Sequence, residues 1–233
     1  FFPEHGDNVE DLVAHADTAM YQAKRNGKNT WSLYDPSRNH SKAMMARMTW
    51  RGRIDQALRE ESLELHFQGI YSTTDGELRH VETLVRMRDN AGKLVFPDHF
   101  IPVAEQSGQI PEIDRWVIRK AIAQIEKQPA LSLSVNLSGR VLDDPLLLQW
   151  FHGELQASGI DPSRLIVEIT ETAAVANVQD AIAFMREIKA LGCRFALDDF
   201  GSGFSSFAYL KQLPVDIVKI DGAFIQHIAS NTD

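Results

Sequence analysis

The sequence predicts an α/β fold, and the order of its elements favours a (β/α) barrel. From residue 63 onward, short runs rich in β-branched and other apolar residues alternate with longer amphipathic segments. Polar side chains stand near the ends of several of these short runs. Such an alternation is typical of parallel strands joined by helical crossovers, and it leaves a barrel and a doubly wound sheet as the two solutions.

The composition is that of a globular protein without disulfides. The 233 residues are 44% hydrophobic and carry a formal net charge of −8. This acidic balance argues against binding to a nucleic acid polymer or to anionic lipid. The single cysteine, Cys193, excludes an intramolecular disulfide and a multi-cysteine zinc site. No stretch has the roughly 20 apolar residues of a membrane helix, so we expect a cytoplasmic protein, whose parent chain leaves room for an upstream membrane anchor.

The first 61 residues precede the alternating pattern. Apolar residues between 9 and 23 recur at helical spacing, Gly27 is placed to cap this helix, and WSLY, 31–34, is a short predicted strand. Residues 1–35 are too few to bury a core alone, so we expect them to belong to a domain whose remainder lies elsewhere. The charged stretch 36–61 is predicted to be a helix that leads into the main domain, 62–233.

The main domain contains six predicted strands: 63–71, 80–87, 131–138, 165–171, 195–200 and 215–221. Amphipathic helices are predicted at 113–127 and 178–192, because apolar residues recur there every three or four positions. Alternation along the third strand, LSLSVNLS, places three small polar side chains on one face: Ser132, Ser134 and Asn136. Such a face suggests the polar end of a barrel interior.

Charged residues near the carboxyl ends of these strands are the candidates for a functional site. Side-chain alternation places five of them there: Glu82, Glu168, Asp198, Lys219 and Asp221. Carboxylates with the amide of Asn136, and no His or Cys at ligand spacing, select Mg²⁺ or Mn²⁺ over zinc. Asp198 and its neighbour Asp199 allow two ions, an arrangement that activates water and stabilises phosphoryl oxygens. Lys219 is then placed to orient the water or to offset developing charge.

Six ordered motifs, from about residue 54 to the end, resemble the EAL family of cyclic di-GMP phosphodiesterases. These motifs are VETLVRMRD, FIPVAEQSG, VNLS, VEITE, LDDFGSGFSSFAYL and LPVDIVKID. The N-terminal stretch HADTAMYQAKRNGKN is similar to the last part of a GGDEF diguanylate cyclase domain, which commonly precedes an EAL domain. The nucleotide-binding and signature loops of GGDEF domains are absent, so no cyclase activity is expected of this remnant.

The resemblance implies a TIM-like (β/α) barrel of the EAL type and hydrolysis of one phosphodiester bond of cyclic di-GMP to linear pGpG. It implies a two-metal site for Mg²⁺ or Mn²⁺ with five ligands: Glu82, Asn136, Glu168, Asp198 and Asp199. Lys219 of the KID motif is implicated in positioning the nucleophilic water, and Asp221 follows it. Glu171 is expected to hold the loop that begins at Gly201. Two residues are expected to contact the dinucleotide: Gln68 and Arg86.

The chain departs from the family pattern within the motifs and at its end. The EAL motif reads Glu82-Thr83-Leu84, Met87 replaces the usual aromatic residue, and Gly69 replaces a proline. We expect the hydroxyl of Thr83 to be tolerated. Residues 222–233 alone follow Asp221, so the expected barrel lacks its last two strand-helix units and the glutamate motif of the seventh family strand.

Three functions are compatible with these observations. The first is a metal-dependent cyclic di-GMP phosphodiesterase in bacterial signalling, which the retained ligands favour for the intact parent protein. The second is a non-hydrolytic cyclic di-GMP receptor with a degenerate or incomplete EAL site, and the third is an unrelated divalent-metal barrel enzyme. The incomplete barrel argues against turnover by this chain as it stands. The family also suggests a homodimer and an upstream sensory or GGDEF region in the parent chain.

Overall fold

The computed structural model describes most of the chain: residues 9, 12, 13, 15, 16, 19, 20, 23, 31–34, 50–89, 91–201 and 207–224. The chain divides into two compact units, Phe1–Gly52 and Arg53–Asp233. Three predicted features lie outside the described residues: the cap at Gly27, most of the linker helix, and the loop 202–206. The predicted domain boundaries at 35 and 61 stay a prediction.

The N-terminal unit contains the predicted helix, because every described position between 9 and 23 is helical. Residues 31–34 have no regular secondary structure, so the predicted strand WSLY is wrong. A strand needs a neighbouring strand that satisfies its backbone groups, and residues 31–34 have no strand conformation. The ring of His15 stacks on that of Tyr34 instead, with centroids 3.7 Å apart.

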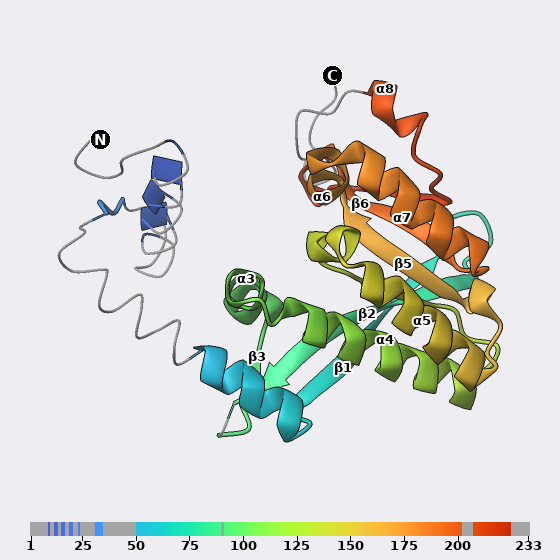
Figure 1. Cartoon of the computed structure of the whole chain (residues 1–233), viewed down its shortest axis with the longest axis horizontal. Helices are drawn as coiled ribbons and strands as arrows, with labels where there is room; N and C mark the ends of the chain where they lie inside the picture. Colours follow the sequence, from blue (N-terminus) through green and yellow to red (C-terminus); the bar gives the residue numbers. More distant parts are fainter. Residues whose placement is uncertain are drawn as a thin grey trace. The chain divides into compact units, whose positions relative to one another are not determined.

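The second unit is built on a seven-stranded sheet (Figure 1). The strands are β1 (Leu63–Tyr71), β2 (Leu78–Arg88), β3 (Leu94–Val95), β4 (Leu133–Asn136), β5 (Leu165–Thr170), β6 (Arg194–Phe200) and β7 (Ile217–Ile220). Their order is β1-β2-β4-β5-β6-β7, and β3 pairs with β2. All six predicted strands are confirmed, and neighbours from β2 through β4, β5 and β6 to β7 run parallel as expected.

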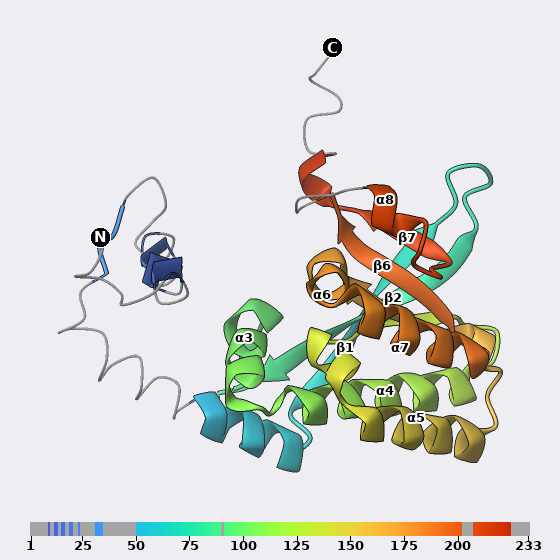
Figure 2. The same ribbon diagram turned by 45° about the horizontal axis from the view of Figure 1, so that its top comes forward.

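The pairing of β1 with β2 corrects the expectation of parallel strands, because the two run antiparallel. Residues 72–77 are the whole connection between them, whereas a parallel crossover needs a dozen or more residues. The segment therefore forms a hairpin, drawn in teal in Figure 2. The short β3 also escaped prediction, since two residues carry no periodic signal.

The helices of this unit are α3 (Pro97–Ser107), α4 (Ile110–Lys127), α5 (Pro145–Ser158), α6 (Glu171–Ala176), α7 (Val178–Ala190) and α8 (Phe207–Leu210). Residues 50–59 are helical as well, in agreement with the end of the predicted linker helix. Figures 1 and 2 show α4, α5 and α7 along one face of the sheet. None of the described helices is long and apolar enough to cross a membrane.

Helix α5 was not predicted, although both of its ends carry clear signals. The side chain of Asp144 accepts hydrogen bonds from the backbone N–H groups of Leu146 and Leu147, which makes it an N-cap. Gly159 ends the helix in the left-handed conformation, with φ at 66°. Helix α3 was obscured by Pro102 inside it, because an internal proline argues against a helix in sequence reasoning.

Alternation along the strands separates a core face from a polar face. On the core face, Phe195 of β6 packs edge-on against Phe184 of α7, with ring centroids 6.2 Å apart. Phe195 pairs in register with Val167 of β5, and Val167 pairs in turn with Val135 of β4. Both valines are fully buried. The residues next to them in sequence therefore point to the opposite side of the sheet. Glu168 and Asn136 lie on that opposite side.

Thr83 links β2 to β4 beside the first candidate ligand. Its side chain is 2% exposed, and its hydroxyl donates a hydrogen bond of 2.7 Å to the backbone carbonyl of Ser134. The register pairs Glu82 of β2 with Ser134 of β4 at the same level. The extra hydroxyl of this chain is thus accommodated by a buried hydrogen bond between two strands.

We expect Thr83→Val to lower the free energy of unfolding by about 1 kcal/mol, because valine keeps the shape of threonine and removes the buried donor. Urea unfolding followed by circular dichroism would measure this loss. Thr74→Val, at an exposed position of the hairpin, serves as the control. An unchanged midpoint for Thr83→Val would show that the hydroxyl contributes nothing to stability.

Candidate metal centre

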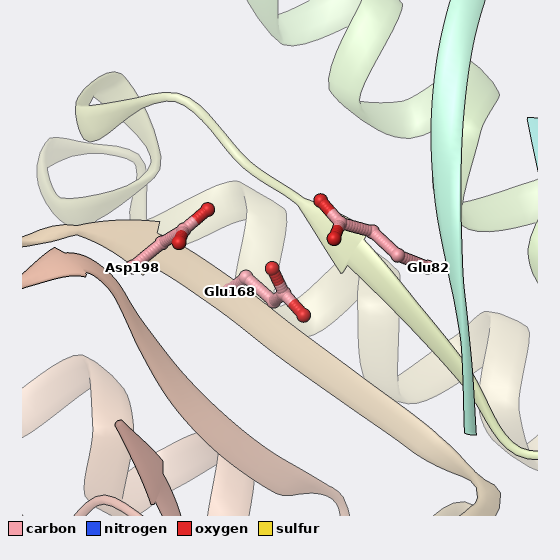
Figure 3. Close-up of side chains that lie close together, drawn as sticks. All are labelled: Glu82, Glu168 and Asp198. Atoms are coloured by element: carbon pink, nitrogen blue, oxygen red, sulfur yellow. The ribbon is translucent and has the colours of Figure 1, made fainter. Parts of the chain in front are cut away.

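Three carboxylates from three strands converge on the polar face of the sheet. They belong to Glu82 of β2, Glu168 of β5 and Asp198 of β6, and one oxygen of each lies within 4.8 Å of the others. Figure 3 shows these side chains turned toward a common space. Their side chains are 12%, 0% and 18% exposed. Three of the predicted metal ligands are therefore brought together in a nearly dry environment.

The ammonium group of Lys219, on β7, lies among these three carboxylates. Its Nζ atom is 2.6 Å from Oε2 of Glu168, 2.9 Å from Oδ2 of Asp198 and 3.0 Å from Oε2 of Glu82. Like charges at this separation repel strongly in a low dielectric, and one positive charge offsets part of that repulsion. Lys219 thus stabilises the cluster while remaining next to the reacting centre that the sequence predicts.

Asn136 lies at the rim of the cluster, opposite Glu168 in the register of β4 and β5. Its side-chain Nδ2 donates a hydrogen bond of 2.9 Å to Oε1 of Glu82. The amide oxygen of the same side chain is the atom that would ligate a cation. The structure therefore brings the predicted amide ligand against the predicted carboxylates.

A β-bulge explains how two consecutive aspartates reach the same end of β6. The pairing of β6 with β7 shifts between Leu197 and Phe200, and Asp199 has a positive φ of 53°. Such a bulge breaks the strict alternation of side chains and re-aims one of them. The backbone N–H of Asp199 donates to Oδ1 of Asp198 at 2.9 Å. Asp199 itself is exposed and lies outside the three-carboxylate cluster.

Burial and neighbouring charges shift the ionisation of the cluster. Burial raises the pKa of Glu168, and the ammonium of Lys219 opposes this shift. Burial also raises the pKa of Asp199, and the negative charges of Asp198 and Asp221 add to the effect. Burial alone would lower the pKa of Lys219, but the carboxylates, Glu168 foremost, outweigh it and the pKa is raised. The carboxylates around Lys219 therefore favour its protonated form.

The donor set fits a hard divalent cation. Three carboxylates carry a charge of −3, Lys219 contributes +1, and the sum of −3 + 1 = −2 is the charge that one such ion would balance. Oε1 of Glu168 is buried and has no hydrogen-bond partner among the described residues. A buried carboxylate oxygen without a partner is costly, and a bound cation would reduce this cost. Oxygen donors of this kind suit a hard divalent cation.

Glu171 anchors the chain just after the aspartate pair. Its side chain is 3% exposed, and Oε2 accepts a hydrogen bond of 2.8 Å from the backbone N–H of Gly201. Gly201 has a φ of 98°, and a β-carbon there would collide with the ring of Phe224, so glycine is required. This contact agrees with the predicted role of Glu171 at the start of the loop, whose residues 202–206 lie outside the description.

Asp221 makes hydrogen bonds to the short turn that follows it in the chain. Its Oδ1 accepts a hydrogen bond of 2.6 Å from the backbone N–H of Ala223, and its carbonyl accepts from Phe224. These bonds cap a short 3₁₀ turn, Gly222–Phe224. Asp221 also raises the pKa of Asp199, so the two carboxylates lie near each other. A catalytic role for Asp221 stays a prediction.

The two predicted dinucleotide contacts lie on the hairpin strands next to the cluster. Gln68 of β1 is exposed and pairs in register with Glu82. Arg86 of β2 donates to the backbone carbonyl of Val85 and lies over the ring of Phe96, 5.1 Å from its centroid. Its Nε is buried without a partner among the described residues. Gln68 therefore lies beside a residue of the cluster, Arg86 lies four residues further along β2, and contact of either side chain with a ligand stays a prediction.

A cavity of about 380 Å³ opens beside the cluster, and sequence reasoning missed it. Asn136 and Thr170 line its side toward the strand ends, and α3 and α4 supply apolar walls. Asp114 of α4, 3% exposed, also lines it and accepts a hydrogen bond of 2.7 Å from the hydroxyl of Ser138. Burial raises the pKa of Asp114 to about 7. Asp114 interrupts an apolar helix face, which is the one signal that the sequence offered.

The fold and the site together define an α/β protein with a mostly parallel sheet and a cluster of carboxylates at its strand ends. The EAL domain family matches residues 51–233, and the chain belongs to this family. It is 36% identical over 229 residues to the cyclic di-GMP phosphodiesterase PdeB of Shewanella oneidensis, covering 96% of this chain and 27% of that protein. An uncharacterized signaling protein of Caulobacter vibrioides is 37% identical over 228 residues, covering 97% and 28% of the two chains.

Solved structures of EAL domains share this fold. The FimX EAL domain of Pseudomonas aeruginosa, bound to c-di-GMP, superposes with a TM-score of 0.74 at 32% identity, covering 78% of this chain and 74% of that one. The PaMucR phosphodiesterase in complex with c-di-GMP gives the same TM-score of 0.74 at 32% identity, with 79% and 77% covered. The predicted TIM-like barrel of the EAL type is confirmed. The chain spans 27% to 30% of the length of the curated relatives it matches first.

The buried carboxyl of Asp114 gives a pH-dependent stability. Its pKa is about 7 in the folded protein and 3.8 in the reference state, so the folded state holds a proton that the unfolded state has lost between these values. Stability contributed by this group is therefore lost as the pH rises from about 4 to about 7, by at most roughly 4 kcal/mol.

Asp114→Asn removes this titration, and we expect the stability difference between the wild type and the variant to change across that pH range. Urea unfolding at pH 4.5, 6 and 8 would measure the difference. The wild type should lose stability relative to the variant as the pH rises. Parallel pH profiles for the two proteins would contradict the raised pKa.

Proposed function

We propose that this chain carries the catalytic centre of a cyclic di-GMP phosphodiesterase, which hydrolyses one phosphodiester bond and releases linear pGpG. The observation that carries the proposal is the cluster of Glu82, Glu168 and Asp198 around Lys219. Membership of the EAL family, and relatives named as cyclic di-GMP phosphodiesterases, support this substrate.

The three clustered carboxylates and Asn136 would hold Mg²⁺ or Mn²⁺, and Asp199 would add a ligand for a second ion. When bound, such ions lower the pKa of a water molecule and offset charge on phosphoryl oxygens. The protein residues have the task of holding the ligands in place, excluding bulk water and balancing charge. The near-zero exposure of Glu168 and the anchored start of the loop at Gly201 serve these tasks.

Lys219 would act as a fixed positive charge beside the scissile phosphate. The neighbouring carboxylates raise its pKa and favour the protonated form, which would donate hydrogen bonds to an incoming water or to a phosphoryl oxygen. A preorganised cation in a desolvated site stabilises developing negative charge more strongly than water does.

The cavity beside Asn136 is suited to a purine base of the dinucleotide. Its walls are mainly apolar, and pockets for small ligands combine such walls with a few polar groups that fix orientation. We expect Arg86 to meet a phosphate, since its buried Nε has no partner among the described residues. We expect Gln68, which pairs in register with Glu82, to contact the ligand from β1.

Glu82→Ala is expected to reduce turnover of cyclic di-GMP at least about 100-fold, because the loss of a ligand leaves the cation weakly held. The full-length protein would be incubated with cyclic di-GMP and Mg²⁺ or Mn²⁺, and the products separated by chromatography. Glu77→Ala, at a strongly exposed position just before β2, is the matched control and should retain full turnover.

Two outcomes would contradict the proposal in different ways. Binding of cyclic di-GMP without any pGpG, under conditions in which a phosphodiesterase relative turns over, would identify a non-hydrolytic receptor. Undiminished turnover by Glu82→Ala would show that the cluster is not the catalytic centre. Absence of binding by the full-length protein would remove cyclic di-GMP as the ligand.

Glu171→Ala is expected to lower kcat while the affinity for Mn²⁺ changes little. The substitution removes the acceptor for the backbone N–H of Gly201, and it removes no atom of the three-carboxylate cluster. Steady-state kinetics and a Mn²⁺ titration of the same preparation would separate the two effects. Thr172→Ala, at the exposed neighbouring position, is the control. Equal losses of kcat and Mn²⁺ affinity would contradict a role confined to the loop.

A further inference from the structure

The three clustered carboxylates have the same pattern of partners, with one exception. Each offers one oxygen to Lys219: Oε2 of Glu82, Oε2 of Glu168 and Oδ2 of Asp198. The other oxygen of Glu82 accepts from the side chain of Asn136, and the other oxygen of Asp198 accepts from the backbone N–H of Asp199. The other oxygen of Glu168, Oε1, is buried and has no partner among the described residues.

Ser134 carries a second unpartnered polar atom on the same face of the sheet. It is 0% exposed, and its Oγ has no hydrogen-bond partner in the described part of the chain. A buried polar atom without a partner costs about 1–3 kcal/mol. Two such atoms in one site therefore require an explanation, and a hydroxyl can supply the proton that a carboxylate oxygen accepts.

The register places the two groups within reach of each other. Asn136 of β4 pairs with Glu168 of β5, so Ser134, two residues before Asn136, is the diagonal neighbour of Glu168 on the same face. The backbone of Ser134 is itself fixed, because its carbonyl accepts the hydrogen bond from Thr83.

We propose that Ser134 is a positioning residue whose hydroxyl donates a hydrogen bond to Oε1 of Glu168 and so orients this carboxylate toward the bound cation. The inference rests on the proposed function, since it assigns a partner to a ligand of that site. A carboxylate has about four lone-pair sites, so Oε1 can accept this bond and still contribute to cation binding. Ser134 completes the pattern in which every clustered carboxylate has a partner of its own besides Lys219.

The test is a Mn²⁺ titration of the full-length protein without cyclic di-GMP, with free Mn²⁺ followed by electron paramagnetic resonance. Ser134→Ala should weaken Mn²⁺ binding about 10-fold to 100-fold, the range found when an outer partner of a metal ligand is removed. Ser134→Thr and Ser134→Val form a matched pair, because they add the same bulk and differ in the hydroxyl. The threonine variant should bind Mn²⁺ more tightly than the valine variant by a similar factor.

Ser132→Ala is the control just before β4; by alternation Ser132 lies on the same side as Ser134 but one layer further from Glu168, and the variant should bind Mn²⁺ like the wild type. Thermal melts of the metal-free variants separate loss of the fold from loss of the ligand's orientation. If the two bulkier variants do not fold, the comparison of Ser134→Ala with Ser132→Ala decides. Wild-type Mn²⁺ affinity in Ser134→Ala would overturn the inference and leave the proposed function standing. A wild-type protein that binds no Mn²⁺ would overturn both.

Discussion

The convergence of three carboxylates on one ammonium group is the constraint on which the rest of this structure depends. Glu82, Glu168 and Asp198 come from separate strands and are almost completely shielded from water. Without Lys219 their mutual repulsion would act in a low dielectric and oppose folding. The lysine removes one of three negative charges and leaves a site that still attracts a cation. The sheet register matters functionally because a slip of one residue would send these side chains to the opposite face.

The bulge in β6 is the second geometric condition of the site. In a regular strand, the side chains of Asp198 and Asp199 would point to opposite faces of the sheet. The positive φ of Asp199 breaks this alternation. A non-glycine residue in this region costs of order 1 kcal/mol or more, and the surrounding pairs of β6 with β5 and β7 maintain it. The local strain therefore lies where the proposed second ligand is needed, as expected of a functional feature rather than of a defect.

The strands and the face of each ligand could be predicted from sequence, because period-two alternation survives in short parallel strands. Alternation alone placed Glu82, Glu168, Asp198 and Lys219 near one edge. It could not reveal the antiparallel β1, which follows from the length of the connection, or the bulge at Asp199, which has no local signature. Asp114 was missed for another reason: it stands on a helix, lines the cavity and accepts a hydrogen bond from Ser138. Such tertiary contacts leave no periodic signal in the sequence.

The ends of β5 and β6 are connected twice, and this double connection ties the loop to the cluster. Glu168 and Asp198 meet at Lys219, while Glu171, three residues after Glu168, binds the backbone of Gly201, two residues after Asp199. A displacement of the loop at Gly201 would therefore pull on the strand end that holds the aspartate pair. The loop anchor at Gly201 and the carboxylate cluster thus share the ends of the same two strands but use different side-chain atoms. The position of the loop and the binding of a cation can therefore be altered separately by substitution.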